Sequence, residues 1–299
     1  MRTIDEKILT TAPVEKRHAS PHETAFGQPR DFLTNRFVYM VVSTRARGLS
    51  IGVNMNPDKL CNFDCVYCEV DRSEPREIKL DVDAMAVELR RTLAFVHEKR
   101  LHERSYYRTL PDELLQLRQV ALSGDGEPTL APDFSEAVQS VIRVRAMGEF
   151  PFFKIVLFTN ATGLDRPQVS EGLKHFTKSD EVWAKLDGGT QTFLSQVNKP
   201  DVSLEKLLAN ILSLARQRPV IIQSLFAALN GEEPSFDEIR EYAQRLKELK
   251  NNGAQIPLVQ IYSATRPMSR AECGHLPLKA LSQIAQTVRN ITGLKTEVF

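Results

Sequence analysis

Residues 119–159, QVALSGDGEPTLAPDFSEAVQSVIRVRAMGEFPFFKIVLFT, contain one complete unit of the pattern that decides the fold. A β-rich run at Gln119–Ser123 ends in polar and glycine residues, and an amphipathic stretch follows from about Asp133 to Met147. A second β-rich run, Lys154–Thr159, is apolar at most positions, which is typical of a strand covered by helices. Because parallel strands need a crossover connection, this order predicts two parallel strands joined by a helix.

The same alternation continues on both sides of this unit. The predicted strands are Leu49–Met55, Gln119–Ser123, Lys154–Thr159, Glu181–Leu186, Val220–Phe226 and Pro257–Tyr262. The predicted helices cover residues 81–103, 133–147, 166–176, 203–216, 235–250 and 278–292. Six strands alternating with six helices indicate an α/β protein with a parallel sheet. A doubly wound sheet and an incomplete α/β barrel share this pattern, and both place functional groups at the carboxyl ends of the strands.

Length and composition limit the class of protein. The chain has 299 residues, and α/β barrels of about 200–250 residues occur as one domain. We predict an N-terminal extension at residues 1–48 and one α/β domain at residues 49–299. Apolar residues make up 42% and charged residues 26%, which excludes disorder, collagen and coiled coil for the whole chain. The net charge of +1 gives no global positive field that would attract nucleic acid or an anionic membrane.

The N-terminus and the hydropathy predict a cytoplasmic protein without a membrane partner. No run approaches the roughly 18 apolar residues that span a bilayer. The first residues, MRTIDEKILTTAPVEK, mix charges and lack the apolar core of a secretory signal. In a reducing compartment, clustered cysteines indicate metal binding or redox work rather than a disulfide framework.

Three of the four cysteines crowd into residues 61–68, CNFDCVYC, with the spacing C-x3-C-x2-C. Three soft thiolates suit an iron–sulfur cluster or zinc. A [4Fe–4S] cluster held by Cys61, Cys65 and Cys68 would leave one iron open for a substrate or cofactor. A structural zinc ion needs a fourth ligand, for which the chain offers Cys273 or His275. The zinc alternative describes a zinc-stabilised binding protein without catalysis.

A charged pair ends the fourth predicted strand. Side chains alternate along a strand, so Lys185 and Asp187 lie on the same face, opposite Leu186. An inward-facing charged pair costs free energy unless it is functional or mutually satisfied. We therefore predict Lys185 and Asp187 as catalytic residues.

The cysteine motif, with an aromatic residue just before its third cysteine and a strand before its first, resembles the signature of the radical S-adenosylmethionine (SAM) superfamily. The resemblance implies a partial (β/α)6 TIM-like barrel, and six units are counted here. It implies a [4Fe–4S] cluster on Cys61, Cys65 and Cys68, with SAM bound to the fourth iron. It also implies a reductant such as flavodoxin or ferredoxin, reductive cleavage of SAM to a 5′-deoxyadenosyl radical, and hydrogen abstraction from a substrate.

The resemblance extends to residues that would bind SAM. The matching positions are Tyr67, Gly126, Glu127, Pro128, Thr129, Thr159 and Asn160. Tyr67 matches the aromatic position near the adenine, and residues 126–129 match the segment that receives the SAM amino group. A carboxylate and exposed carbonyls suit an ammonium group, and glycine permits a close backbone approach. Thr159 and Asn160 match polar contacts to the ribose or carboxylate, although a turn-forming Asn at a strand end is the alternative.

Three stretches narrow the resemblance to the branch of the wyosine-base tRNA synthases and their uncharacterised bacterial relatives, over roughly residues 37–299. They are SGDGEPTL at 123–130, KLDGGTQTFLSQVNKP at 185–200 and IYSATRP at 261–267. The wyosine synthases carry a second cluster on additional cysteines, mainly upstream. Here no cysteine precedes Cys61 and only Cys273 remains, which argues against the wyosine reaction. The substrate class stays open between RNA, a small metabolite and a peptide.

Overall fold

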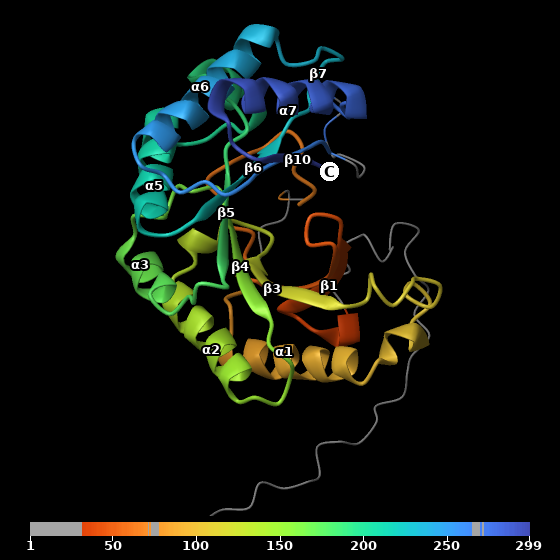
Figure 1. Ribbon diagram of the computed structural model, residues 1–299. Helices are drawn as coiled ribbons and strands as arrows, with labels where there is room; N and C mark the ends of the chain where they lie inside the picture. Colours follow the sequence, from red (N-terminus) through yellow and green to blue (C-terminus); the bar gives the residue numbers. More distant parts are fainter. Residues whose placement is uncertain (1–31, 71, 73–77, 265–269, 271) are drawn as a thin grey trace, which may run out of the picture.

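An eight-stranded sheet, curled into an incomplete barrel, forms the centre of the protein. The computed structural model describes residues 32–70, 72, 78–264, 270 and 272–299, so most of the predicted N-terminal extension lies outside the described residues. The strand order is β1-β2-β3-β4-β5-β6-β8-β10, and each neighbouring pair is parallel except β1 and β2. Helices lie in an arc around the convex side of the sheet (Figure 1). The predicted α/β class and partial barrel are therefore confirmed.

The bounds of the elements follow the predicted alternation. The strands of the large sheet are β1 (Val38–Ser43), β2 (Gly48–Asn54), β3 (Leu117–Ser123), β4 (Lys154–Thr159), β5 (Glu181–Lys185), β6 (Val220–Leu225), β8 (Val259–Tyr262) and β10 (Thr296–Val298). A separate two-stranded sheet pairs β7 (Ala228–Leu229) with β9 (Cys273–Gly274). The helices are α1 (Val82–His97), α2 (Phe134–Ala146), α3 (Pro167–Leu173), α4 (Gln191–Val197), α5 (Leu204–Gln217), α6 (Phe236–Asn251) and α7 (Leu278–Thr292). The six predicted strands correspond to β2, β3, β4, β5, β6 and β8.

Several elements differ from the prediction, and the strands β7, β9 and β10 were not predicted. The sheet begins at Val38 rather than at residue 49, because β1 pairs with β2 as an antiparallel edge strand. The helix predicted at residues 81–103 ends at His97, since Lys99 adopts a left-handed backbone with φ of 57°. The short helix α4 was not predicted. Thr190 caps its first turn by accepting a hydrogen bond from the Phe193 N–H.

The two faces of the sheet differ in polarity. Ala184, Ile222 and Val259 lie side by side in register and belong to the apolar core beneath the helices. The neighbouring row on the opposite, concave face contains Lys185, Gln223 and Gln260. The concave face therefore offers polar groups, as a ligand-binding barrel interior requires.

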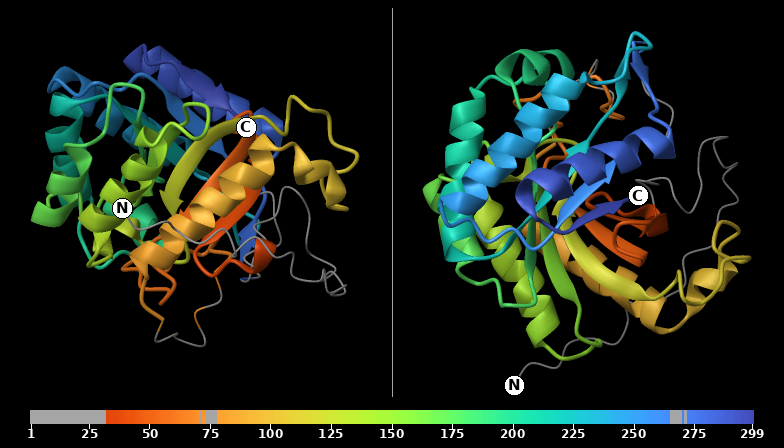
Figure 2. Two further views of the ribbon diagram at one scale, coloured as in Figure 1. Left: turned by 90° about the horizontal axis from the view of Figure 1, so that it is seen from below. Right: turned by 45° about the horizontal axis from the view of Figure 1, so that its top comes forward.

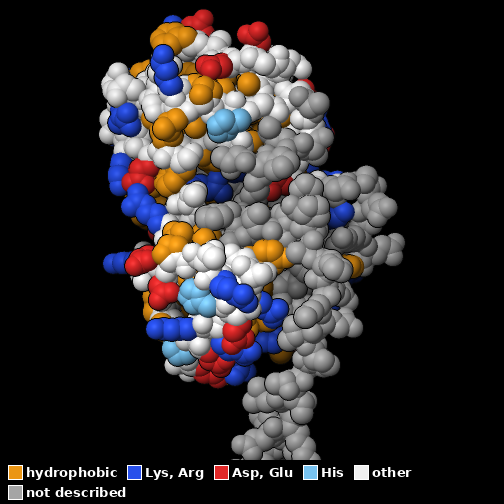
Figure 3. All heavy atoms as spheres, turned by 90° about the vertical axis from the view of Figure 1, so that its right-hand side faces the viewer, with side chains coloured by type: hydrophobic (Ala, Val, Ile, Leu, Met, Phe, Trp, Pro, Cys, Tyr) orange, Lys and Arg blue, Asp and Glu red, His pale blue; other side chains and the backbone are white. Residues whose placement is uncertain are grey.

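The described surface shows a mixture of charges. Viewed from the open side of the barrel in Figure 3, acidic and basic side chains are interspersed over the described part of this face. Arg100, for example, lies 3.5 Å from a carboxylate oxygen of Glu98 and 3.1 Å from one of Glu103. None of the helices in the described ranges has the length and apolar character that crossing a bilayer requires.

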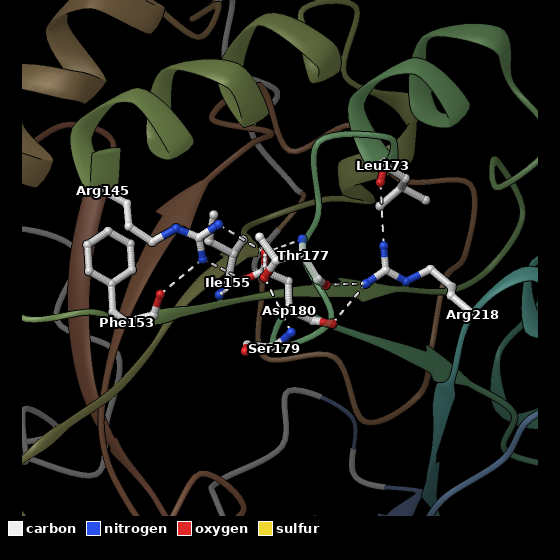
Figure 4. A network of polar contacts seen from close by, with 8 residues as sticks. All are labelled: Arg145, Phe153, Ile155, Leu173, Thr177, Ser179, Asp180 and Arg218. Carbon is white, nitrogen blue, oxygen red and sulfur yellow. Dashed lines mark hydrogen bonds and ion pairs between the residues drawn. The ribbon is translucent and has the colours of Figure 1, made fainter. Parts of the chain in front are cut away.

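A buried ion pair joins elements at the amino-terminal end of the barrel strands (Figure 4). Figure 2 shows the barrel from two further directions. Arg145 of α2 donates two hydrogen bonds to Asp180, at 2.6 and 3.0 Å, and both side chains are almost inaccessible to solvent. Asp180 also accepts from the backbone N–H groups of Ile155 and Thr177. Arg218 donates to the carbonyl oxygen of Asp180 at 2.9 Å. These contacts join α2, β4, β5 and β6 at the end opposite the candidate active site.

We expect Asp180→Asn to lower the free energy of unfolding by about 3–5 kcal/mol at pH 7, because it leaves the Arg145 charge buried without its partner. Burial alone would raise the pKa of Asp180, but the hydrogen bonds from Arg145, Ile155 and Thr177 hold it below 3.8. The contribution is therefore complete above about pH 4 and is lost as the pH falls through the folded-state pKa. Urea denaturation at pH 7 and pH 3 measures both effects.

The matched control is Glu149→Gln, which removes the exposed ion pair with Arg90. An exposed pair contributes less than about 1 kcal/mol. Equal losses of unfolding free energy in the Asp180 and Glu149 variants would contradict the stabilising role of the Arg145–Asp180 ion pair.

Candidate active site

The cysteine loop, residues 61–68, follows β2 at the carboxyl end of the sheet and is held by the end of α4. The Asp64 N–H donates to the carbonyl oxygen of Asn198 at 2.9 Å, and the Val66 N–H donates to that of Val197 at 2.8 Å. The last carbonyl groups of a helix have no partner within the helix. The end of α4 therefore supplies acceptors that fix the backbone of the loop.

The three cysteines of this loop are half-buried residues, and none of the four cysteines, all of which are described, forms a disulfide. The Phe63 N–H lies 3.5 Å from Cys61 Sγ. Burial raises the pKa of Cys61 to about 12 and that of Cys65 to about 11. A thiolate here therefore needs a positive partner, and a coordinated metal supplies one.

The described ranges contain no group of three or more His, Cys, Asp or Glu side chains arranged to hold a metal ion. This applies to the three cysteines of the loop and to a zinc set completed by Cys273 or His275. Cys273 is buried in a small apolar cluster with Val66, and His275 Nδ1 contacts the Ala264 carbonyl oxygen. The donor chemistry of three thiols on one loop fits an iron–sulfur cluster, and their role as its ligands stays a prediction.

The loop after β3 packs directly on the cysteine loop. The Glu127 N–H donates to the Leu60 carbonyl oxygen at 2.9 Å. A Cβ atom on Gly126 would lie only 1.9 Å from the same oxygen. Gly126 is thus required by the close approach of two backbone segments of the protein itself.

The Glu127 carboxylate is fully used within the protein. One oxygen accepts from the Thr129 N–H, the Thr129 hydroxyl and the Thr159 hydroxyl, at 3.0, 2.5 and 2.6 Å. The other accepts from the Asn160 N–H at 2.6 Å. Burial raises the pKa of Glu127, and these hydrogen bonds oppose the increase. The side chain therefore joins the loops after β3 and β4.

Glu127→Gln is expected to destabilise the protein by about 1–3 kcal/mol, because its amide NH2 must face groups that are themselves donors. Urea denaturation measures the loss. Glu136→Gln, an exposed change on α2, is the control and leaves the midpoint nearly unchanged. An equal midpoint for both variants would show that the carboxylate does not hold the two loops together.

The loop after β4 completes the contact between neighbouring loops. Asn160 Nδ2 donates to Asn62 Oδ1 at 3.0 Å, and Asn160 Oδ1 accepts from the Thr162 N–H. Pro128 begins a short 3-10 turn at Pro128–Leu130 that follows Glu127. The structure therefore brings together the cysteine loop and the segments at 126–129 and 159–160, as predicted from the strand ends.

Lys185 and Asp187 meet Tyr67 inside the mouth of the barrel. Lys185 Nζ lies 3.3 Å from Asp187 Oδ1, 3.2 Å from the Tyr262 hydroxyl and 4.9 Å from the centre of the Tyr67 ring. The Tyr67 hydroxyl donates a short hydrogen bond to Asp187 Oδ2. Burial alone would lower the pKa of Lys185, but Asp187 raises it above its ordinary value. The two side chains are mutually satisfied, with the Lys185 side chain 21% exposed and Asp187 only 1%.

The sequence analysis missed Asn198, which contacts both the cysteine loop and Asp187. It stands in the QVNKP stretch that carried part of the resemblance, although no role was assigned to it. Gln260 lies on the same concave face as Lys185. Its side chain accepts a hydrogen bond from Gln223 at 2.8 Å and forms none with Lys185 or Asp187.

A cavity of about 660 Å³ borders the cysteine loop between α4 and the start of α6. Val66, Phe193 and Leu229 form apolar parts of its wall, and Glu233 and Glu272 form acidic parts. The cavity wall thus contains carboxylates, whereas the polar centre of the concave face is the Lys185–Asp187 ion pair.

Known proteins similar to this chain were found by sequence and by structure. No protein-family model matches the chain. A UPF0026 protein of Helicobacter pylori strain J99 is 29% identical over 231 residues, which are 75% of this chain and 66% of that protein. A UPF0026 protein of Methanocaldococcus jannaschii is 25% identical over 213 residues, 71% and 60% of the respective chains. The chain thus spans about two thirds of the length of these relatives.

Several solved structures share the architecture. A radical SAM methyltransferase from Sphaerobacter thermophilus matches 88% of this chain and 68% of its own, with a TM-score of 0.63 and 16% identity. The chain shares the fold of this enzyme. SuiB of Streptococcus suis, bound to S-adenosylmethionine, matches 85% of this chain and 51% of its own, with a TM-score of 0.57 and 15% identity. TYW1 with a lysine–pyruvate adduct matches 86% and 84%, with a TM-score of 0.55 and 13% identity.

The resemblance predicted from the cysteine motif is therefore confirmed at the level of the fold. In this shared fold, the cysteine loop lies after the first parallel strand, β2. Its neighbours are the loops after β3 and β4 and the Lys185–Asp187 pair at the end of β5. Because one fold hosts many reactions, the chemistry depends on these residues.

Proposed function

We propose that this chain is a radical SAM enzyme that holds a [4Fe–4S] cluster with Cys61, Cys65 and Cys68 and cleaves SAM reductively. The observation that carries the proposal is the position of three thiols on one loop at the carboxyl end of a barrel of this fold. That loop is fastened by the end of α4 and by the loops after β3 and β4. A ligand set held from three sides keeps its geometry during electron transfer.

When bound, the cluster supplies the electron that splits the S–C5′ bond of SAM into methionine and a 5′-deoxyadenosyl radical, which takes a hydrogen atom from the substrate. The chain's own residues bind and orient the reactants. The backbone carbonyls of Gly126 and Thr129 would accept from the SAM amino group, because the Glu127 carboxylate and the carbonyls of Glu127 and Pro128 already accept hydrogen bonds within the protein. Thr159 and Asn160 hold this segment in place, and Tyr67 forms one side of the adenine site.

Lys185 and Asp187 have unequal parts in this proposal. Lys185 is the more exposed partner, so its ammonium group donates to a polar group of the substrate. Asp187 is a positioning residue, because it accepts from Tyr67 and from the Leu225 N–H and balances the lysine charge. A small electron-transfer protein such as flavodoxin or ferredoxin delivers the electron. The substrate belongs to one of three classes: RNA, a metabolite or a peptide.

Anaerobic reconstitution with iron and sulfide tests the proposal. The purified protein is expected to be brown, to contain about four iron atoms per chain, and to release 5′-deoxyadenosine and methionine slowly when given dithionite and SAM. Mass spectrometry detects both products. A colourless protein that contains zinc would instead support the alternative function, a zinc-stabilised binding protein without catalysis. A full, reducible cluster with bound SAM and no deoxyadenosine over hours would contradict the enzyme.

A further inference from the structure

Asn198 stands between a cysteine of the loop and the buried aspartate of the barrel. Its side chain is fully buried. The amide nitrogen Nδ2 lies 3.3 Å from Cys65 Sγ, 2.8 Å from Asp187 Oδ2 and 2.8 Å from the Tyr67 hydroxyl. One amide group therefore contacts Cys65 of the loop and both Tyr67 and Asp187 at the mouth of the barrel.

The backbone of Asn198 fixes this orientation. Asn198 follows the last residue of α4, and its N–H donates to the Leu194 carbonyl oxygen. Its own carbonyl oxygen accepts from the Asp64 N–H of the cysteine loop. The residue is held on both sides, so the side chain does not need to reorganise to reach Cys65.

The amide has two hydrogens and three acceptors, so at least one hydrogen is shared. Asp187 Oδ2 also accepts from Tyr67, which makes this carboxylate the most strongly satisfied of the three acceptors. The side-chain oxygen of Asn198 is buried and has no hydrogen-bond partner among the described residues. The contacts of this side chain are thus made by its donor end, which faces groups that carry or acquire negative charge.

We propose that Asn198 is a positioning residue that holds Cys65 as a cluster ligand and raises the reduction potential of the cluster by donating a hydrogen bond to the Cys65 sulfur. This inference rests on the proposed function. Hydrogen bonds to the ligand sulfurs stabilise the additional electron of a reduced cluster. Asn198 also separates this sulfur from the Asp187 carboxylate, whose charge would disfavour reduction.

Asn198→Leu and Asn198→Ala test the role, because both remove the donor and the leucine nearly keeps the volume. At one fixed potential, the ratio of reduced to oxidised cluster should fall about tenfold, which corresponds to about 59 mV for a one-electron couple. Electron paramagnetic resonance during a dithionite titration measures this ratio without SAM or substrate. Because solvent exposure also shifts the potential, the nearly volume-preserving leucine variant isolates the loss of the donor.

Asn210→Leu is the matched control. Asn210 is another buried asparagine, on α5, that donates to the Ala161 and Thr162 carbonyl oxygens. We expect it to destabilise the fold but leave the potential and iron content unchanged. Loss of iron from the Asn198 variants alone would support the role of this residue in holding Cys65.

The outcomes separate this inference from the proposed function. A wild-type protein that assembles no iron–sulfur cluster overturns the proposed function and the inference with it. A wild-type protein with a normal cluster, together with Asn198 variants of unchanged iron content and unchanged potential, overturns only the role of Asn198. If Asn198→Leu does not fold, the alanine variant gives the same comparison.

Discussion

Replacing any one of Cys61, Cys65 or Cys68 with Ala is expected to abolish cluster retention and deoxyadenosine formation, whereas Cys273→Ala keeps both. Two thiolates cannot hold a cubane that is designed for three protein ligands and one open iron. Cys273 packs in an apolar cluster with Val66, so its removal leaves a small cavity and no missing ligand. Iron and sulfide analysis, with the visible spectrum, measures cluster retention in each variant.

The Cys273 variant is also the control for nonspecific damage, since it removes a thiol from the same end of the barrel. Equal losses of iron in all four variants would mean that Cys273 is a fourth ligand, and the open-iron proposal would fail. If the wild type contains zinc instead of iron and each variant loses it, the result would indicate a zinc-stabilised binding protein.

The second large effect is expected at the charged pair of the barrel mouth. Lys185→Met and Asp187→Asn should each keep the iron content near normal and lower deoxyadenosine formation, or its coupling to turnover, about a hundredfold. A displacement of the reactants by about 1 Å is sufficient for a loss of this size. Asp187→Asn also weakens the contacts of this side chain with Tyr67 and Lys185. Deoxyadenosine per iron, measured by mass spectrometry, reports the loss.

In the double variant, stability should return toward the wild-type value while activity stays low. Each single change leaves one largely buried charge without its partner, which costs about 3–5 kcal/mol when the group is desolvated. The double variant Lys185→Met/Asp187→Asn removes both charges, so we expect its unfolding midpoint to recover while its deoxyadenosine yield stays low. A wild-type yield from the double variant would exclude the pair from the active site and leave the fold assignment intact.

Local patterns in the sequence were sufficient for the parts of this protein that depend on neighbours along the chain. The alternation of β-rich and amphipathic runs predicted six strands of the barrel, because the spacing of apolar residues within each run indicates which of its faces is buried. The spacing of Cys61, Cys65 and Cys68 placed three thiols on one loop after a strand. The alternation of side chains placed Lys185 and Asp187 on one face, and their contact at 3.3 Å agrees.

Tertiary structure decided the partners of each group, because these partners lie far apart in sequence. The Glu127 carboxylate looked available for an ammonium group, yet hydrogen bonds from a loop more than 30 residues away occupy it. The strand β1 reads as part of an extension until its edge pairing with β2 is seen. Asn198 reaches Cys65 across 133 residues only because α4 ends beside the cysteine loop. Periodicity reports which face of an element is buried, but packing alone determines what that face meets.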